Sequence, residues 1–196
     1  MNIMKFIPVL CLVASSLVLF GQHTPVIEYA AVGTFNWDLF KGKVNPKHLD
    51  EMGKNTGAVT VSSISYSTLD ITSRSATVLI TARFHPEESW TRYPKLNDPD
   101  GALVHEKKHL DITEIYARKL RQQVSTTRFS AGRFQEEVKQ MFRQVVSDQR
   151  AEQARYDRDT QHSTDPVQQE KWNSRIDTQL KALSAYADNT VKVVFK

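Results

Sequence analysis

Apolar residues recur at helical spacing in the middle of the chain. One set repeats every seven residues and shares a side with Leu120, namely Leu103, Leu110, Ala117 and Val124. This periodicity predicts an amphipathic helix of about six turns. The preceding run Asp98–Asp100 is typical of a helix start, because it supplies an N-cap side chain, a proline for the first turn and an acid that the helix dipole favours.

Two further segments follow the same spacing toward the C-terminus. The first is expected to run from a cap at Ser130 to about Tyr156, and its apolar positions are Phe134, Val138, Met141, Phe142, Val145 and Val146. The second is expected from about Val167 to Tyr186, and its apolar positions are Trp172, Ile176, Leu180 and Leu183. The second half of the chain is therefore predicted to be helical, with a last strand near residues 191–195.

The first half alternates apolar and polar residues instead. Ser75–Phe84 places apolar side chains at every second position, and Gly57–Tyr66 is rich in Val, Thr, Ser and Ile. Val26–Tyr29 is a shorter segment of the same kind. Such segments predict strands with one face on a core. The expected fold class is α+β, in which a small, mostly antiparallel sheet is followed by a helical half.

The N-terminus has the residue order of a secretory signal peptide. Residues 1–21 hold a single cation, Lys5, then an almost continuous apolar run, Phe6–Phe20, and the small residue Gly21. An uncleaved anchor is the alternative. Cleavage would leave residues 22–196 as one domain, secreted or periplasmic. We expect no stable membrane insertion of that domain, because no later stretch is long and apolar enough to span a bilayer.

Composition narrows the chemistry that this domain can carry. The chain has 1 cysteine, Cys11, which lies within the predicted signal peptide. Any metal of the mature chain must therefore be held by His and carboxylates. The formal net charge is +4, and basic residues are interleaved with acids along the predicted helices. That distribution indicates solvated helix surfaces, so we expect no nucleic-acid partner, and the oligomeric state stays unknown at this point.

The central predicted helix carries His105-Glu106-Lys107-Lys108-His109, which has the H-E-x-x-H spacing. Side chains four residues apart lie on one face of a helix, so both imidazoles can bind the same metal ion. In this arrangement two His bind zinc, and the intervening Glu accepts a proton from an activated water. His105 and His109 are therefore predicted zinc ligands, and Glu106 is the predicted general base. The alternative is a surface helix whose His residues have this spacing by chance.

A catalytic zinc site needs a third protein ligand beside the two His. His162 is the first candidate, because it follows the second predicted helix at a junction where a side chain can be directed at another helix; an ordinary polar loop in which His162 binds nothing stays equally open from the residues alone. Glu152 and Glu137 are the alternatives, because both lie on that second helix. Any of the three leaves one coordination position for water.

Other polar residues near these positions have predicted supporting roles. Tyr156 is expected to donate a hydrogen bond to the oxyanion of the reaction, and Asp157 or Asp159 to orient an imidazole. Asp111 lies two residues beyond His109, about 200° around the helix, so it cannot share a metal with both His. An orienting or structural role is expected for Asp111.

Two groups of residues carry a resemblance to a known family. The first is His105–Leu120, and the second comprises Tyr156, Asp157, Thr160 and His162. Trp172 and a set of N-terminal residues add to these groups, namely Trp37, Phe40, Gly42 and Val61–Tyr66. Together they resemble a bacterial family of uncharacterised secreted proteins described as predicted zinc-dependent proteases. The resemblance implies a zincin-like peptidase of the cell envelope or exterior. Ser163 stands where that family often has Gly, and Lys107-Lys108 is more basic than its counterpart.

These observations predict an exported zinc-dependent metallopeptidase, with Zn²⁺ as its cofactor and a peptide or protein as its substrate. Glu106 would guide an activated water onto the carbonyl carbon of a peptide bond. Two alternatives stay open. One is a zinc-binding protein of the cell envelope without catalysis, and the other is a structural protein whose helical half packs against another envelope component.

Overall fold

The computed structural model describes residues 25–44 and 56–196, so the predicted signal peptide lies outside the described residues. The strands are β1 (Ile27–Glu28), β2 (Ala58–Val59), β3 (Ser62–Ile71), β4 (Ser75–Phe84), β5 (Trp90–Thr91) and β6 (Thr190–Val194). The helices are α2 (Pro99–Thr126), α3 (Phe134–Thr160) and α4 (Pro166–Ala182), and the 3-10 turns are η1 (Tyr29–Ala31), η2 (Trp37–Leu39) and η3 (Ser184–Tyr186). Strands lie mostly in the first half and helices in the second, which confirms the predicted α+β fold class.

The β3–β4 hairpin is the central element of the main sheet. β3 pairs with β4 from Ser62 opposite Phe84 to Ile71 opposite Ala76. The other edge of β4 pairs with β1 at one end and β6 at the other, and all these pairings are antiparallel, as predicted. β2 pairs with β5 in a separate two-stranded sheet. The outer edges of β2 and β3 pair with no strand in the described ranges.

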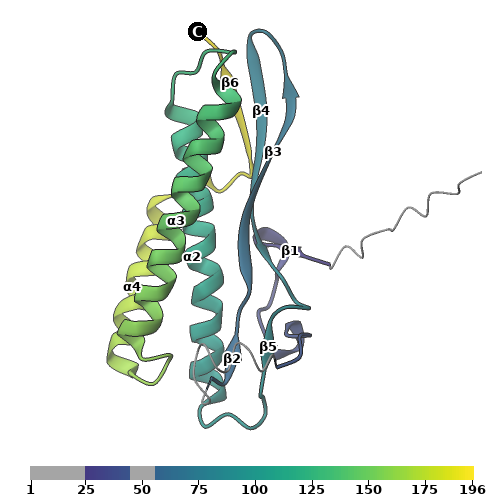
Figure 1. Ribbon diagram of the computed structural model, residues 1–196. Coiled ribbons are helices and arrows are strands. Elements are labelled where there is room, and N and C mark those ends of the chain that lie inside the picture. The colour runs from purple at the N-terminus through teal and green to yellow at the C-terminus, as the bar shows by residue number, and fades with distance from the viewer. Residues whose placement is uncertain (1–24, 45–55) are drawn as a thin grey trace, which may run out of the picture.

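One face of β4 is buried against the helices because its apolar side chains alternate along the strand. The buried apolar residues of β4 are Ala76, Val78, Ile80, Ala82 and Phe84. From the helix side, α2 contributes Ala117, Leu120 and Val124, all fully buried in the same cluster. Figure 1 shows the three helices gathered on one side of the hairpin. α2 contacts both the sheet and the other two helices, so it lies at the centre of the molecule.

The helix that carries the H-E-x-x-H residues begins where the sequence predicts. Asp98 is the N-cap of α2, and its Oδ1 accepts a hydrogen bond from the Gly101 N–H at 3.0 Å. The next helix differs from the prediction at both ends. Arg133 occupies the N-cap position of α3 without a side-chain hydrogen bond, because Ser130 lies in the preceding turn, and the helix continues to Thr160.

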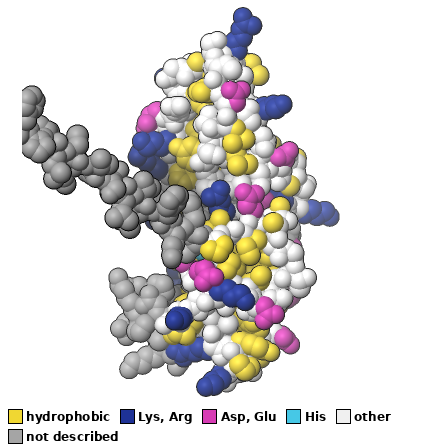
Figure 2. All heavy atoms as spheres, turned by 90° about the vertical axis from the view of Figure 1, so that its right-hand side faces the viewer, with side chains coloured by type: hydrophobic (Ala, Val, Ile, Leu, Met, Phe, Trp, Pro, Cys, Tyr) yellow, Lys and Arg dark blue, Asp and Glu magenta, His cyan; other side chains and the backbone are white. Residues whose placement is uncertain are grey.

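Figure 2 shows the molecule from the hairpin side, where Lys and Arg side chains are interspersed with Asp and Glu. This face therefore carries charges of both signs instead of a patch of one sign, and apolar side chains lie among the charged ones. No helix in the part of the chain that the structure describes has the length and apolar character needed to cross a bilayer.

Candidate metal centre

The two predicted zinc ligands of α2 face α3 across an antiparallel helix interface. Hydrogen bonds between the helices recur at every fourth residue of each, and they join Thr113 to Gln149, His109 to Gln153 and His105 to Asp157. Residues four apart lie on the same side of a helix, so three successive turns of α2 and α3 are in register. This register places one acidic side chain of α3 against both His of α2.

Three side-chain atoms at this interface form a small triangle. Nε2 of His105 lies 3.1 Å from Nε2 of His109. Oδ1 of Asp157 lies 3.2 Å from the first of these atoms and 2.9 Å from the second. A tetrahedral zinc ion with bonds of about 2.0–2.1 Å places neighbouring ligand atoms roughly 3.3–3.4 Å apart. The triangle is close to that spacing, and its three residues could together hold a metal ion.

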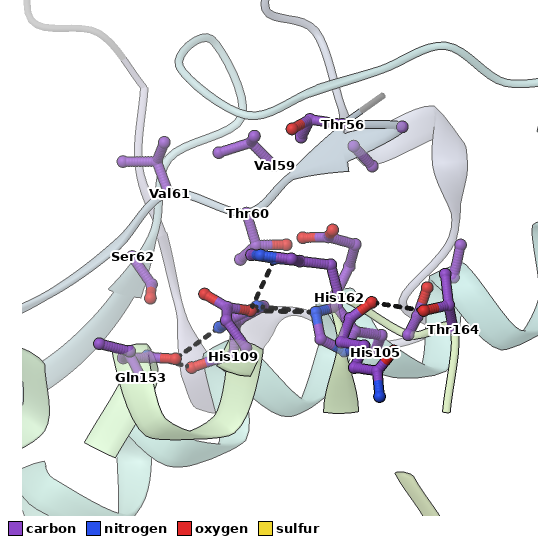
Figure 3. Close-up of a pocket in the computed structure, with 18 of the residues that line it drawn as sticks. Thr56, Val59, Thr60, Val61, Ser62, His105, His109, Gln153, His162 and Thr164 are labelled. Carbon is purple, nitrogen blue, oxygen red and sulfur yellow. Dashed lines mark hydrogen bonds and ion pairs between the residues drawn. The ribbon is translucent and has the colours of Figure 1, made fainter. Parts of the chain in front are cut away.

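The triangle lines a cleft of about 690 Å³. Four parts of the chain surround this cleft, namely the extended segment Thr56–Ser62, α2, α3 and the loop residues 161–164. Figure 3 shows the extended segment on one side of the two His and the helices on the other. A concave site with a few converging polar groups is the usual form of a site for a small molecule or a peptide.

Glu106 lines the same cleft and is only 6% exposed. Its Oε2 is buried and has no hydrogen-bond partner among the described residues. A carboxylate oxygen in this state has lost its hydration without compensation from the protein. Oε2 is therefore a buried acceptor that no described residue satisfies, on a side chain that lines the cleft where a general base would act.

The outer nitrogen of each imidazole faces a glutamine. Nδ1 of His109 lies 2.5 Å from Oε1 of Gln153 on α3, and Nδ1 of His105 lies 3.0 Å from Oε1 of Gln169 on α4. Imidazoles that bind a metal generally donate their other N–H to an acceptor of this kind. The residues present therefore fit a zinc ion bound by His105, His109 and Asp157, with a fourth position left for water.

His109 and Asp157 strongly influence each other's ionisation. Burial lowers the pKa of His109, but the hydrogen bond to Asp157 and the charges of Asp157 and Glu106 outweigh it, and the pKa rises to about 9. Burial likewise opposes ionisation of Asp157, but its contacts with the Nε2 atoms of His105 and His109 hold its pKa well below the usual range. When no metal is bound, the imidazole of His109 is therefore in its positively charged form at neutral pH.

Tyr156, the predicted oxyanion donor, is fully buried against His105. The two rings stack with a centroid distance of 4.6 Å and an interplanar angle of 19°. The Tyr156 hydroxyl donates to the His105 carbonyl oxygen at 3.3 Å and accepts from Nε2 of Gln169 at 2.7 Å. Burial raises the pKa of this hydroxyl. Tyr156 thus packs against the His105 ring and does not line the cleft.

His162, the predicted third ligand, lines the same cleft from the loop after α3. Its Nδ1 lies 3.8 Å from Oδ1 of Asp157, and its side chain is 60% exposed. Three successive residues, Gln161–Ser163, have positive φ angles of 48°, 52° and 71°. Left-handed backbone is rare in residues with a Cβ, so this turn carries conformational strain. The structure thus places His162 beside the triangle, whereas the three donors that lie together are His105, His109 and Asp157.

The two glutamates considered as alternative ligands lie elsewhere. Glu152 forms ion pairs with Arg155 at 3.2 Å and with Arg175 at 2.8 Å. Glu137 lies 3.3 Å from Arg133 at the start of α3. Neither glutamate lines the cleft.

Asp111 and Asp159, the other two aspartates considered in the sequence analysis, also lie apart from the donor atoms. Asp111 is fully buried, and its Oδ1 accepts from the Tyr29 hydroxyl at 2.9 Å and from Lys107 at 2.7 Å. It ties the N-terminal segment to α2. Asp159 lies 3.9 Å from Arg158. Of the two aspartates predicted to orient an imidazole, Asp157 is the one whose carboxylate contacts both His.

Two residues that contact the imidazoles, Gln153 and Gln169, were not predicted from the sequence, and Asp157 was predicted only to orient an imidazole. Gln153 and Asp157 do repeat the four-residue spacing of His105 and His109, and that spacing on a second amphipathic helix is a usable signal. Gln169 has no comparable signal, because it comes from a third helix and depends on how α4 packs.

Comparison with known proteins assigns no activity to this site. The model of a family described as "Bacterial protein of unknown function (DUF922)" matches residues 50–163, more than half of the chain. The matched region includes the α2 and α3 residues of the triangle and also His162. Gln169 lies beyond it. No curated protein and no solved structure matches the chain.

Proposed function

We propose that this chain, which belongs to the bacterial family of unknown function DUF922, is an exported zinc-dependent peptidase. One observation carries the proposal. The donor atoms of His105, His109 and Asp157 lie together in the cleft that also holds the unpartnered carboxylate oxygen of Glu106. Two His and one carboxylate form a ligand set that catalytic zinc sites use, with one position open for water.

In the proposed reaction, a bound zinc ion would polarise the peptide carbonyl and lower the pKa of a water molecule at the open position. Glu106 takes a proton from the water as the water oxygen adds to the carbonyl carbon. It then passes that proton to the nitrogen of the leaving amine as the C–N bond breaks. One water molecule is consumed for each bond, and the products are a carboxylic acid and an amine, which become a carboxylate and an ammonium group by proton transfer. Burial of Glu106 keeps bulk water away from this proton transfer.

An extended polypeptide suits the cleft because an open strand edge lines it. The carbonyls of Gly57 and Val61 accept hydrogen bonds from the segments at β5 and at the end of β4. Backbone groups alternate in direction along such a pairing. Ala58, Thr60 and Ser62 therefore direct their N–H and C=O groups to the edge that no described strand covers. A substrate added at this edge would lie over the two His (Figure 3).

His162 has a role toward the substrate in this proposal. Its imidazole is largely exposed and lines the cleft. A donor in this place can hydrogen-bond the carbonyl oxygen that becomes negatively charged during attack. His162 takes this role from Tyr156, whose hydroxyl is occupied by the His105 carbonyl.

The test compares the wild-type protein with Glu106→Gln, and uses Glu137→Gln as a matched control on α3 outside the cleft. Zinc content is measured by elemental analysis, and hydrolysis is measured on a fluorogenic peptide library. All three proteins should bind one zinc ion per chain. Glu106→Gln should hydrolyse peptides at least about 100-fold more slowly, because it cannot accept a proton, and Glu137→Gln should match the wild type.

Two results would overturn the proposal in different ways. A wild-type protein without stoichiometric zinc, after reconstitution at neutral pH, would show that the triangle is not a zinc site. A zinc-loaded protein whose hydrolysis does not depend on Glu106 would show that the site binds metal without the proposed catalysis.

A further inference from the structure

The hydrogen bonds around His109 fix which of its nitrogens carries a proton. Nε2 of Gln153 donates to the backbone carbonyl oxygen of His109 itself, at 2.8 Å. A carbonyl can only accept, so the nitrogen of this amide must face the carbonyl and the oxygen must face the ring. That oxygen lies 2.5 Å from Nδ1. An amide oxygen also can only accept, so Nδ1 of His109 carries a proton and Nε2 is the nitrogen left for a metal.

The same reasoning applies to His105, where Tyr156 lies between the glutamine and the backbone carbonyl. Tyr156 has one hydroxyl proton, which it donates to the His105 carbonyl at 3.3 Å. Its oxygen therefore accepts from Nε2 of Gln169 at 2.7 Å. This orientation turns Oε1 of Gln169 to Nδ1 of His105, 3.0 Å away. Nδ1 of His105 thus also carries a proton, and its Nε2 faces that of His109.

We infer that Gln153 and Gln169 are positioning residues that hold His105 and His109 as a pair of Nε2 ligands. Each amide fastens one imidazole to the backbone carbonyl of the same residue, directly for His109 and through Tyr156 for His105. The ring can then neither flip nor exchange its tautomer without breaking two hydrogen bonds. The inference rests on the proposed zinc site and adds residues from two further positions, one of them on α4.

Gln149 provides a matched control on the same helix. It lies one turn before Gln153, is buried at the same interface, and donates to the Thr113 hydroxyl at 3.1 Å without contacting an imidazole. Methionine is a suitable replacement at all three positions, because it is unbranched and of similar length but offers no amide acceptor. A loss that is due only to disturbed packing would affect Gln149→Met as much as the other two variants.

Zinc affinity is measured by competition with a chelator. Gln153→Met and Gln169→Met should each bind zinc about 10–100-fold more weakly than the wild type, as is usual when the partner of a metal-binding His is removed. Gln149→Met should stay within about threefold. Gln153→Glu keeps an acceptor for the Nδ1 proton but replaces the donor to the His109 carbonyl by an oxygen, so it should restore only part of the affinity lost in Gln153→Met.

The tautomers are read from long-range ¹H–¹⁵N spectra of the zinc-loaded wild-type protein, which needs no variant to fold. Both rings should show a protonated Nδ1 and zinc on Nε2. Zinc on Nδ1 of either ring would overturn the inference, as would equal losses of affinity in all three methionine variants or no loss in any of them. A wild-type protein that binds no zinc would instead count against the proposed function itself.

Discussion

Oδ1 of Asp157 lies 2.9 Å from Nε2 of His109, across the interface between α3 and α2. The same oxygen lies 3.2 Å from Nε2 of His105, so one carboxylate atom meets both imidazoles at the nitrogens that face the cleft. An acid that only orients a metal-bound imidazole contacts the nitrogen away from the metal, and here that place is taken by glutamine. This is the position that the proposed zinc site requires of its third ligand.

Removal of Asp157 should therefore abolish zinc binding. Asp157→Ala is expected to weaken zinc affinity by more than about 100-fold, which exceeds the loss typical of a residue that contacts a ligand but not the metal. His162→Ala should retain one zinc ion per chain. Elemental analysis after gel filtration measures both. Asp159→Ala is the control, because that carboxylate lies two residues away and pairs with Arg158. Loss of zinc in His162→Ala with retention in Asp157→Ala would restore His162 as the third ligand.

The metal-free protein should lose stability as the pH rises above neutrality. The pKa of His109 is about 9 in the folded protein, against roughly 6.5 in an unfolded chain. The stabilisation from its charge is complete below about pH 6.5 and is lost as the pH rises through about 9, on the order of 3 kcal/mol in total. Urea unfolding at several pH values with a chelator present measures it. Asp157→Asn should flatten this dependence, and a wild-type stability that is constant from pH 6 to 10 would contradict it.

Zinc binding should release a proton near neutral pH. His109 is protonated in the metal-free protein at pH 7.5, because its pKa is about 9, and it must lose that proton before Nε2 can bind zinc. Calorimetric titration in buffers of different ionisation enthalpy should show about one proton released at pH 7.5 and fewer at pH 10. A proton count that does not change with pH would contradict the raised pKa of His109 in the metal-free protein.

Glycine at position 163 should stabilise the loop that carries His162. Ser163 has a φ of 71°, a conformation that glycine adopts without the strain of a Cβ. Ser163→Gly is therefore expected to raise the free energy of unfolding by about 0.5–1 kcal/mol, after allowing for the greater freedom of glycine in the unfolded chain. Thr164→Gly should instead destabilise, because it removes the hydrogen bond to the Gln161 carbonyl. Equal effects of the two substitutions in urea unfolding would argue against this account.

Much of the fold follows from local patterns in the sequence. Strict alternation predicted β4 over the residues that it occupies, and the heptad repeat with its Asp98 cap predicted α2. These patterns suffice because period and capping depend on neighbouring residues alone. The end of α3 was predicted four residues too early, because a polar helix terminus such as Tyr156–Thr160 lacks an apolar stripe to mark it.

The composition of the site depends on contacts that no local pattern contains. The spacing of His105 and His109 predicts which side of α2 they share, but not which residues of α3 lie opposite. That choice follows from the packing of two helices and from the turn between them. The same limit applies to Tyr156, whose phenol suggests an oxyanion donor until its burial under His105 is known.

The matching four-residue steps of α2 and α3 make this site sensitive to chain length as well as to residue type. One residue removed from α3 between Phe134 and Gln153 would turn every later side chain by about 100° about the helix axis. Gln153 and Asp157 would then leave the interface together, and both His would lose their partners in one event. Residues 127–133 join the two helices, and length changes there leave the faces of both helices intact. Insertions should therefore be better tolerated in that turn, away from the buried Phe129, than in the helical stretch that follows it.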